Sequence, residues 1–248
     1  MQLSENAGSK KAGVLVKTTL VDFPGIVASA IFLSGCNLRC PYCYNTGLVL
    51  NNGDAPDAVT LQEVVTHLEQ RKSVIKGFVI SGGEALLSPM LLPLLRAVRE
   101  LGYKVKLDTN GIADNRLEDL IRSEYCPDFI ALDIKTSPAR YAELAPAGLS
   151  EEKKNKLTTS LLHSVKLVSS LPADRREFRT VLVPPLVKED DIRSIAAELP
   201  SDASWMFAQF RNENCLNPEY NNVSPYIQKE LDALVSTAQS LIPGAKLR

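Results

Sequence analysis

The stretch IVASAIFLSGCNLRCPYC, residues 26–43, decides how the rest of the chain is organised. Its first part, Ile26 to Leu33, is an almost continuous apolar run of the length of a buried strand. Ser34 and Gly35 end this run, because small residues of this kind favour turns. A loop with three cysteines follows at once, so the strand is expected to deliver a group of thiols at its carboxyl end.

The same arrangement of a short apolar run followed by polar residues recurs along the chain. It predicts further strands at residues 77–80, 104–107, 129–132, 178–183 and 204–210. Apolar residues at spacings of three and four predict helices that begin near Thr60 and cover residues 91–101, 116–122, 157–168, 192–199 and 227–241, with loops at residues 145–156 and 211–225. This alternation predicts an α/β fold, a partial (β/α)6 barrel of the TIM type with parallel strands.

Polar motifs directly follow four of the predicted strands. The cysteine loop follows the first, and Gly82–Glu84, Asp108–Gly111 and Asp133–Lys135 follow the next three. Ligand sites of parallel α/β folds lie at the carboxyl ends of the strands. We therefore expect the four motifs to converge on the mouth of the barrel.

Composition limits the class of protein. A chain of 248 residues with 45% hydrophobic content can bury one full core, so we expect a single domain with an N-terminal extension (1–25), a barrel core (26–211) and a C-terminal loop and helix (212–248). Lys and Arg total 28 against 29 for Asp and Glu, which argues against nucleic acid or an acidic membrane as partner. No signal peptide or membrane helix is recognisable, so a cytoplasmic protein is expected.

The spacing of the loop cysteines predicts a metal centre. Cys36, Cys40 and Cys43 lie too close together for a disulfide framework, and three thiolates can ligate three irons of a cubane cluster while leaving the fourth iron open. The alternative is a zinc site whose fourth ligand is His67 or His163. CxxxCxxC is not one of the usual paired-cysteine spacings of zinc sites, and both histidines otherwise read as surface or packing residues of helices.

These motifs resemble those of the radical S-adenosylmethionine (radical SAM) superfamily. Its CxxxCxxC signature stands here as Cys36-Asn-Leu-Arg-Cys40-Pro-Tyr-Cys43, and Gly82-Gly83-Glu84 resembles its GGE motif. The resemblance implies one [4Fe–4S] cluster, through which the three cysteines act in catalysis, and a GGE turn that binds the amino group of S-adenosylmethionine. It further implies reductive cleavage of the cofactor to a 5′-deoxyadenosyl radical that abstracts hydrogen, which is oxidoreductase chemistry.

Within the superfamily, the chain is most similar to glycyl-radical enzyme activases, above all those of anaerobic ribonucleotide reductase. The similarity rests on TTLVDFPG (18–25), LDTNG (107–111), LDIK (132–135) and FRTVLVP (178–184). It implies that the cofactor contacts Tyr42, Asp108, Asn110 and Lys135, and that Thr109 and Asp133 hold a monovalent cation. The plainer alternatives are helix capping for the two aspartates and a solvated charge for Lys135.

The chain departs from the family pattern at three positions. Ala85 follows the GGE motif where proline is frequent, Tyr44 follows the third cysteine where histidine is frequent, and Pro185 replaces a glycine. Proline fixes φ and lacks an N–H, so the loop at Pro185 cannot copy a turn built on glycine. The two remaining cysteines, Cys126 and Cys215, read as free thiols.

The activase resemblance implies two protein partners. One is a glycyl-radical enzyme that supplies a glycine as substrate, and the other is a flavodoxin or ferredoxin that supplies the electron. Two other hypotheses stay open at this point: a radical SAM enzyme that acts on a small molecule, similar to the deazapurine synthases, and a non-catalytic interaction module that binds zinc.

Overall fold

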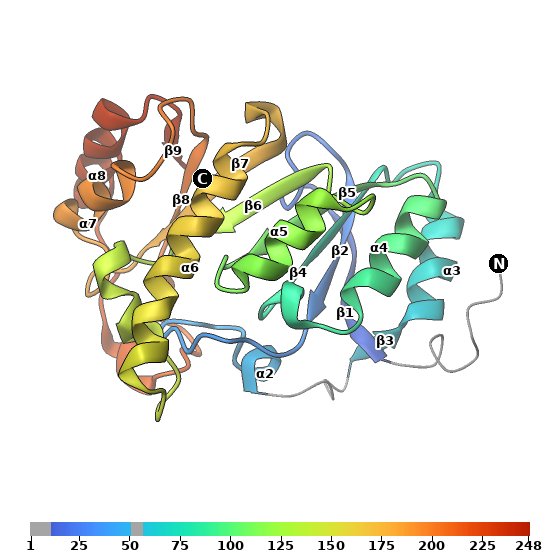
Figure 1. Ribbon diagram of the computed structural model, residues 1–248, viewed down its shortest axis with the longest axis horizontal. Helices are drawn as coiled ribbons and strands as arrows, with labels where there is room; N and C mark the ends of the chain where they lie inside the picture. Colours follow the sequence, from blue (N-terminus) through green and yellow to red (C-terminus); the bar gives the residue numbers. More distant parts are fainter. Residues whose placement is uncertain (1–10, 51–56) are drawn as a thin grey trace. The chain divides into compact units, whose positions relative to one another are not determined.

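The computed structural model describes residues 11–50 and 57–248, which form two compact units (Figure 1). The first unit comprises Met1–Cys36, Gly47–Thr109 and Asp119–Phe129, and the second comprises Asn37–Thr46, Asn110–Glu118 and Ile130–Arg248. The first ten residues of the expected N-terminal extension lie outside the described part. The single domain expected from the chain length stays a prediction.

The first unit is built on strands in the order β3-β1-β2-β4-β5. Their bounds are Lys11–Thr19 for β1, Ala28–Leu33 for β2, Ala58–Thr60 for β3, Gly77–Gly82 for β4 and Lys104–Thr109 for β5. Strands β2, β4 and β5 are parallel, whereas β1 pairs antiparallel with both β2 and β3. The parallel strands therefore bring their carboxyl ends, and the polar motifs that follow them, to the same edge.

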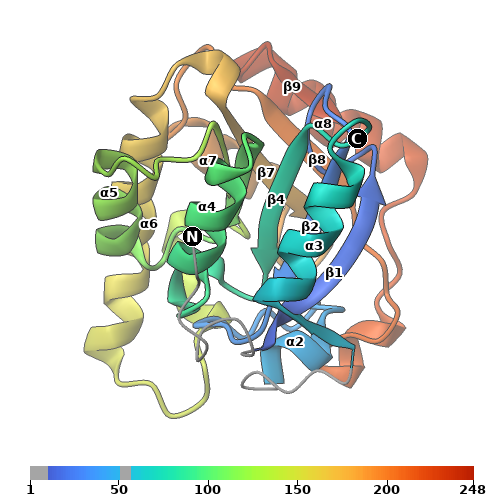
Figure 2. The ribbon, with the colours of Figure 1, turned by 90° about the vertical axis from the view of Figure 1, so that its right-hand side faces the viewer.

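Two helices cover this unit. Helix α3 (Leu61–Arg71) packs beside α4 (Leu91–Glu100) and lies along β1 (Figures 1 and 2). The expected start of α3 is confirmed, because Thr60 Oγ1 accepts a hydrogen bond from the Glu63 N–H at 3.2 Å while the Thr60 N–H donates to Glu63 Oε2 at 2.7 Å. This reciprocal pair is a capping box. The short helix α2 (Thr46–Leu50) and the 3₁₀ helix η1 (Ala85–Leu87) lie in the same part of the sequence.

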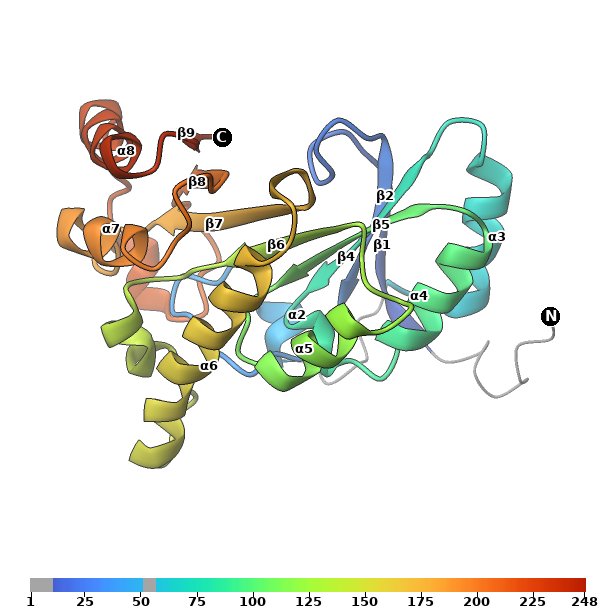
Figure 3. The same ribbon diagram turned by 45° about the horizontal axis from the view of Figure 1, so that its top comes forward.

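The second unit contains parallel strands in the order β6-β7-β8-β9. Their bounds are Phe129–Asp133, Arg176–Leu182, Trp205–Gln209 and Ala245–Leu247. Helices elsewhere in the chain are α5 (Asp114–Arg122), α6 (Glu151–Ser169), α7 (Glu189–Ala196) and α8 (Gln228–Leu241), with 3₁₀ helices η2 (Pro138–Leu144), η3 (Ala173–Arg175) and η4 (Pro218–Asn222). Helices α7 and α8 pack side by side (Figure 3). Trp205 is fully buried in the core, and its indole N–H donates to Thr180 Oγ1 at 3.0 Å.

The α/β class with mostly parallel strands is confirmed. The predicted strands correspond to β2 and β4–β8, and every predicted helix is present. Strands β1, β3 and β9 were not predicted, and β1 adds antiparallel pairs with β2 and β3 at the edge of the parallel strands. The expected loop 145–156 was also wrong in part, because α6 begins at Glu151, where Ser150 Oγ accepts from the Lys153 N–H. None of the described helices is long and apolar enough to cross a membrane.

The capping box gives a direct test of the first unit's stability. Replacing Thr60 with Ala removes the side chain that accepts from the Glu63 N–H, so we expect the free energy of unfolding to fall by about 1 kcal/mol in urea titrations. Thr66→Ala is the matched control, because Thr66 is exposed in the middle of the same helix. Equal effects of the two substitutions would contradict the capping interpretation.

Candidate functional site

The GGE motif lies directly against the start of the cysteine loop in the first unit. The Gly83 N–H donates to the Leu33 carbonyl at 2.9 Å, and the Glu84 N–H donates to the Gly35 carbonyl at 2.8 Å. A Cβ on Gly82 would lie 2.2 Å from the Leu33 carbonyl oxygen, and one on Gly83 would lie 2.1 Å from that of Gly35. Only glycine fits such an approach, and the φ of +129° at Gly82 adds a second reason at that position.

Glu84 connects this turn to the end of β5. Its side chain is almost completely buried, and Oε1 accepts hydrogen bonds from the Leu86 N–H at 3.0 Å and from Thr109 Oγ1 at 2.8 Å. Asp108, the residue before Thr109, forms an ion pair with Lys106, whose Nζ lies 3.1 Å from Oδ1. The first unit thus gathers Cys36, the GGE turn and the end of β5 around one edge, as expected.

Tyr42 carries a buried hydroxyl in the second unit. Its ring lies edge-on to that of Phe210, with centroids 6.4 Å apart, and its side chain is 6% exposed. Among the described residues, the hydroxyl has no hydrogen-bond partner. Burial raises the pKa of Tyr42 well above its ordinary value, and the neighbouring Cys40 adds to the rise. The phenol therefore stays neutral and can donate a hydrogen bond to a ligand.

Asp133 and Lys135 form an ion-pair group with Arg179. Asp133 Oδ1 accepts from Arg179 Nε at 2.6 Å, and Oδ2 accepts from Lys135 Nζ at 2.8 Å. Burial works to raise the pKa of Asp133, but Arg179 and Lys135 outweigh it and hold that pKa well below its ordinary value. Burial likewise works to lower the pKa of Lys135, but Asp133 outweighs it and raises that pKa, so both groups remain charged at neutral pH.

Arg179 was missed as a site residue. The register of β6 and β7 places it opposite Asp133, a pairing between strands that the sequence does not display. The only signal was its place in FRTVLVP, one of the stretches that carry the family resemblance. Both oxygens of Asp133 are bonded by cationic side chains, so its charge is already balanced. This arrangement does not fit a monovalent cation at Asp133.

The rest of the cysteine loop is braced by residues of the second unit. The Asn110 amide donates to Asn37 Oδ1 at 2.8 Å. The Leu216 N–H donates to the Cys43 carbonyl at 2.9 Å, and the Asn217 N–H donates to the Pro41 carbonyl at the same distance. Asn110 therefore shapes the loop, and its contact with a cofactor stays a prediction. The segment after β8, expected only as a loop, supports Cys43.

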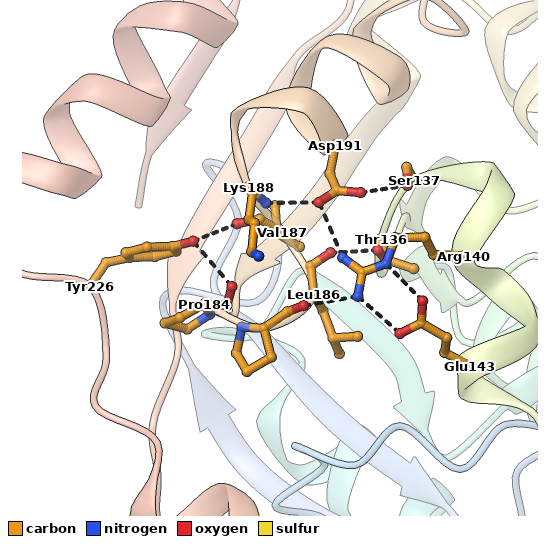
Figure 4. Close-up of polar contacts among 11 residues, drawn as sticks. Thr136, Ser137, Arg140, Glu143, Pro184, Leu186, Val187, Lys188, Asp191 and Tyr226 are labelled. Atoms are coloured by element: carbon orange, nitrogen blue, oxygen red, sulfur yellow. Dashed lines mark hydrogen bonds and ion pairs between the residues drawn. The ribbon is translucent and has the colours of Figure 1, made fainter.

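The loop at Pro184 and Pro185 is held by side chains (Figure 4). The single Tyr226 O–H is shared between the carbonyls of Pro184 and Val187, at 3.3 and 3.0 Å. Arg140 Nη2 donates to the Pro185 carbonyl at 2.9 Å, and Thr136 Oγ1 donates to the Leu186 carbonyl at 2.5 Å. Four successive carbonyls are thus bonded by side chains, which fixes a loop that a glycine-built turn would shape through its own backbone.

Both histidines have partners away from the cysteines. His67 Nε2 lies 3.0 Å from Ser29 Oγ and 3.1 Å from the Lys17 carbonyl oxygen, and His163 Nδ1 lies 3.0 Å from Asp114 Oδ2. Within the described ranges, no three His, Cys, Asp or Glu side chains are gathered around a position for a single metal ion. The two histidines therefore contact residues of β1, β2 and α5 rather than the cysteine loop.

Comparison with known proteins identifies the family. The sequence model described as the Radical SAM superfamily matches residues 30–159, a little over half of the chain. This chain belongs to the Radical SAM superfamily. The match covers the cysteine loop, the GGE turn and the ends of β5 and β6.

Several relatives of this radical SAM protein carry informative names. A Methanocaldococcus jannaschii protein named "Putative glycyl-radical enzyme activating enzyme" is 28% identical over 238 residues, which cover 94% of each chain. The pyruvate formate-lyase-activating enzyme of Clostridium pasteurianum is 34% identical over 121 residues, 47% of this chain and 48% of the relative. The structure of QueE from Escherichia coli superposes with a TM-score of 0.54 at 14% identity and covers 99% of this chain and 98% of that one. That likeness concerns the fold alone, and it confirms the predicted partial-barrel class.

The residues present fit the cofactors that radical SAM proteins use. Cys36, Cys40 and Cys43 supply three thiols, the donor type that holds iron–sulfur clusters. The glycine turn offers close backbone approach, and the buried Tyr42 hydroxyl is a donor that lacks a partner among the described residues. This donor set therefore fits a [4Fe–4S] cluster and S-adenosylmethionine.

The close approach of Gly83 to the Gly35 carbonyl predicts that adding one methyl group at position 83 disturbs the cysteine loop. Gly83→Ala would place Cβ 2.1 Å from the Gly35 carbonyl oxygen, so we expect it to destabilise the protein by about 1–3 kcal/mol and to lower the iron bound per chain after anaerobic reconstitution. Gly47→Ala is the control, because a Cβ there meets nothing within 4 Å. Normal iron content in the Gly83 variant would show that the contact is not needed to hold the loop.

The depressed pKa of Asp133 predicts a pH-dependent contribution to stability. The unfolded chain binds this proton more readily, so the contribution is complete above the unfolded pKa of about 4 and is lost as pH falls toward the folded pKa. We expect Asp133→Asn to cost about 2 kcal/mol at pH 7, and the difference from wild type to shrink below about pH 4 in urea titrations. Asp174→Asn, at an exposed position, is the control for the aspartate-to-asparagine change, and a deficit in the Asp133 variant that stays constant with pH would refute the linkage.

Proposed function

We propose that this radical SAM protein activates a glycyl-radical enzyme. In this proposal it binds one [4Fe–4S] cluster through Cys36, Cys40 and Cys43 and uses S-adenosylmethionine to remove a hydrogen atom from a glycine of a partner protein. The observation that carries the proposal is the backbone contact of the GGE turn with Gly35, next to Cys36, because it sets a cradle for a ligand beside a cluster-ligating cysteine.

The bound cluster and S-adenosylmethionine would supply reductive C–S cleavage and the resulting 5′-deoxyadenosyl radical. The chain's own residues would bind and orient. The GGE turn would hold the amino group of the cofactor, and Lys135, which stays charged beside Asp133, suits an anionic group. The neutral hydroxyl of Tyr42 would donate a hydrogen bond, and Asp108 would accept one from the cofactor.

The choice of a protein substrate rests on the relatives. The M. jannaschii protein matches this chain over 94% of both lengths, and its name states an activating enzyme of glycyl-radical enzymes. The C. pasteurianum relative is an activase of pyruvate formate-lyase. We propose anaerobic ribonucleotide reductase as the partner, in line with the LDTNG and FRTVLVP resemblance, and a flavodoxin or ferredoxin as electron donor in the cytoplasm.

Anaerobic reconstitution tests the chemistry first. After reduction with dithionite in the presence of S-adenosylmethionine, wild type should form methionine and 5′-deoxyadenosine, which chromatography measures. Ala at Cys36, Cys40 or Cys43 should abolish cluster binding and lower product formation by more than about 100-fold, because each variant lacks an iron ligand. Cys126→Ala is the matched control and should keep both. Retained iron and activity in the Cys40 variant would contradict the ligand assignment.

The partner is tested in the same reaction. Adding anaerobic ribonucleotide reductase should produce a glycyl-radical signal in electron paramagnetic resonance, and pyruvate formate-lyase serves as the comparison partner. Cofactor cleavage without a glycyl signal from either protein would favour a small-molecule substrate. A colourless protein with tightly bound zinc and no cleavage would overturn the radical SAM proposal.

A further inference from the structure

We propose that Lys106 is a positioning residue of the cofactor site, which fixes the carboxylate of Asp108 and ties it to the hairpin between β1 and β2. The inference rests on the proposed function, because it takes Asp108 as a cofactor contact. It also assigns a role to the TTLVDFPG stretch (18–25), which carries part of the family resemblance and otherwise has none.

The ammonium group of Lys106 is held at several points. Lys106 lies in the middle of β5 and is 0% exposed. Its Nζ lies 3.1 Å from Asp108 Oδ1 and donates to the Asp22 carbonyl at 2.6 Å. It also lies 5.8 Å from the centroid of the Phe129 ring, within the range of a cation–π contact. Lys106 and Asp108 are two residues apart on one strand, so their side chains share a face.

Burying a lysine at this position costs folding free energy, so stability by itself does not explain its presence. Its neighbours Val105 and Leu107 are fully buried and apolar. Burying an ammonium group requires partners to offset its lost hydration, and apolar replacement of a buried ion pair is often neutral or even stabilising. Apolar residues at both 106 and 108 would fill the same space without that cost. The charge therefore matters for what it does to Asp108, whose side chain is only 10% exposed at the carboxyl end of β5.

The hairpin residue that accepts from Lys106, Asp22, is held in place by its neighbours. Thr19 Oγ1 donates to Asp22 Oδ2 at 2.6 Å and accepts from the Val21 N–H at 3.3 Å. Phe23 is buried, with its ring 6.1 Å from that of Phe129. The Asp22 carbonyl is therefore a fixed acceptor, so a lysine bonded to it holds its ammonium group in one place. A fixed cation in turn restricts rotation of the Asp108 carboxylate, which is how the hairpin would contribute to cofactor binding.

The test measures S-adenosylmethionine binding to anaerobically reconstituted protein by equilibrium dialysis, independently of turnover. We expect Lys106→Met to raise the dissociation constant about tenfold at a temperature where the variant is folded. Its melting temperature should also fall, because the Asp108 carboxylate is left without its cation. Lys106→Gln keeps an N–H donor on the side that faces the Asp22 carbonyl but loses the charge, so it should weaken binding similarly. If the methionine variant does not fold, the glutamine variant tests whether the charge of Lys106 is needed for binding. Lys104→Met, an exposed position at the start of the same strand, is the control and should bind normally.

A double variant shows whether Lys106 acts through Asp108. If it does, Lys106→Met combined with Asp108→Asn should bind no more weakly than Asp108→Asn alone, because interacting residues are not additive. The change that S-adenosylmethionine causes in the resonance spectrum of the reduced cluster should be reduced in Lys106→Met as in Asp108→Asn. Wild-type affinity in both Lys106 variants, or additive losses in the double variant, would overturn the inference while leaving the proposed function standing. Failure of wild type itself to bind or cleave S-adenosylmethionine would overturn the proposed function and this inference together.

Discussion

The GGE turn and the start of the cysteine loop touch backbone to backbone, and the first unit's part of the site depends on that contact. Strands β2 and β4 are parallel neighbours, so Leu33 and Gly82 end side by side. Two hydrogen bonds, from Gly83 to Leu33 and from Glu84 to Gly35, then continue the pairing beyond the strands. No side chain larger than hydrogen fits at Gly82 or Gly83, because the facing carbonyl oxygens lie where a Cβ would stand. The position of Cys36 follows from this close approach.

Charge compensation organises the polar groups around the strand ends. In the first unit, Lys106 balances Asp108, and in the second unit, Arg179 and Lys135 balance Asp133. Each carboxylate is largely buried, so an unbalanced charge would be expensive and the group would take up a proton instead. Arg179 and Lys135 hold the pKa of Asp133 low and so keep it ionised, and Lys106 lies within ion-pair distance of Asp108. A site for a zwitterionic ligand needs charges held in this way, since a mobile carboxylate would reorient toward water.

The departure from the family pattern at Pro185 is accommodated by side chains from elsewhere in the second unit. Pro184 and Pro185 cannot shape a loop through glycine-like backbone freedom. Instead Thr136, Arg140 and Tyr226 bond four successive carbonyl groups of that loop. The segment at Leu216 and Asn217 similarly bonds carbonyls of the cysteine loop. The Pro184–Pro185 loop and the cysteine loop are thus both held by residues that lie far away in the sequence.

The sequence by itself determined strands β2 and β4–β8, the longer helices between and after them, the three cysteines and the GGE turn, because apolar periodicity, close cysteine spacing and paired glycines are local signals. It did not predict β1, since residues 11–19 mix charged and apolar side chains in a strand with exposed positions. Only the tertiary structure showed that Arg179 faces Asp133 and that Lys106 joins Asp108 to the hairpin. Arg179 and Asp133 are 46 positions apart in the sequence, and Lys106 and Asp22 are 84 apart. Strand register and burial bring these residues together, and no short stretch of the chain encodes either of them.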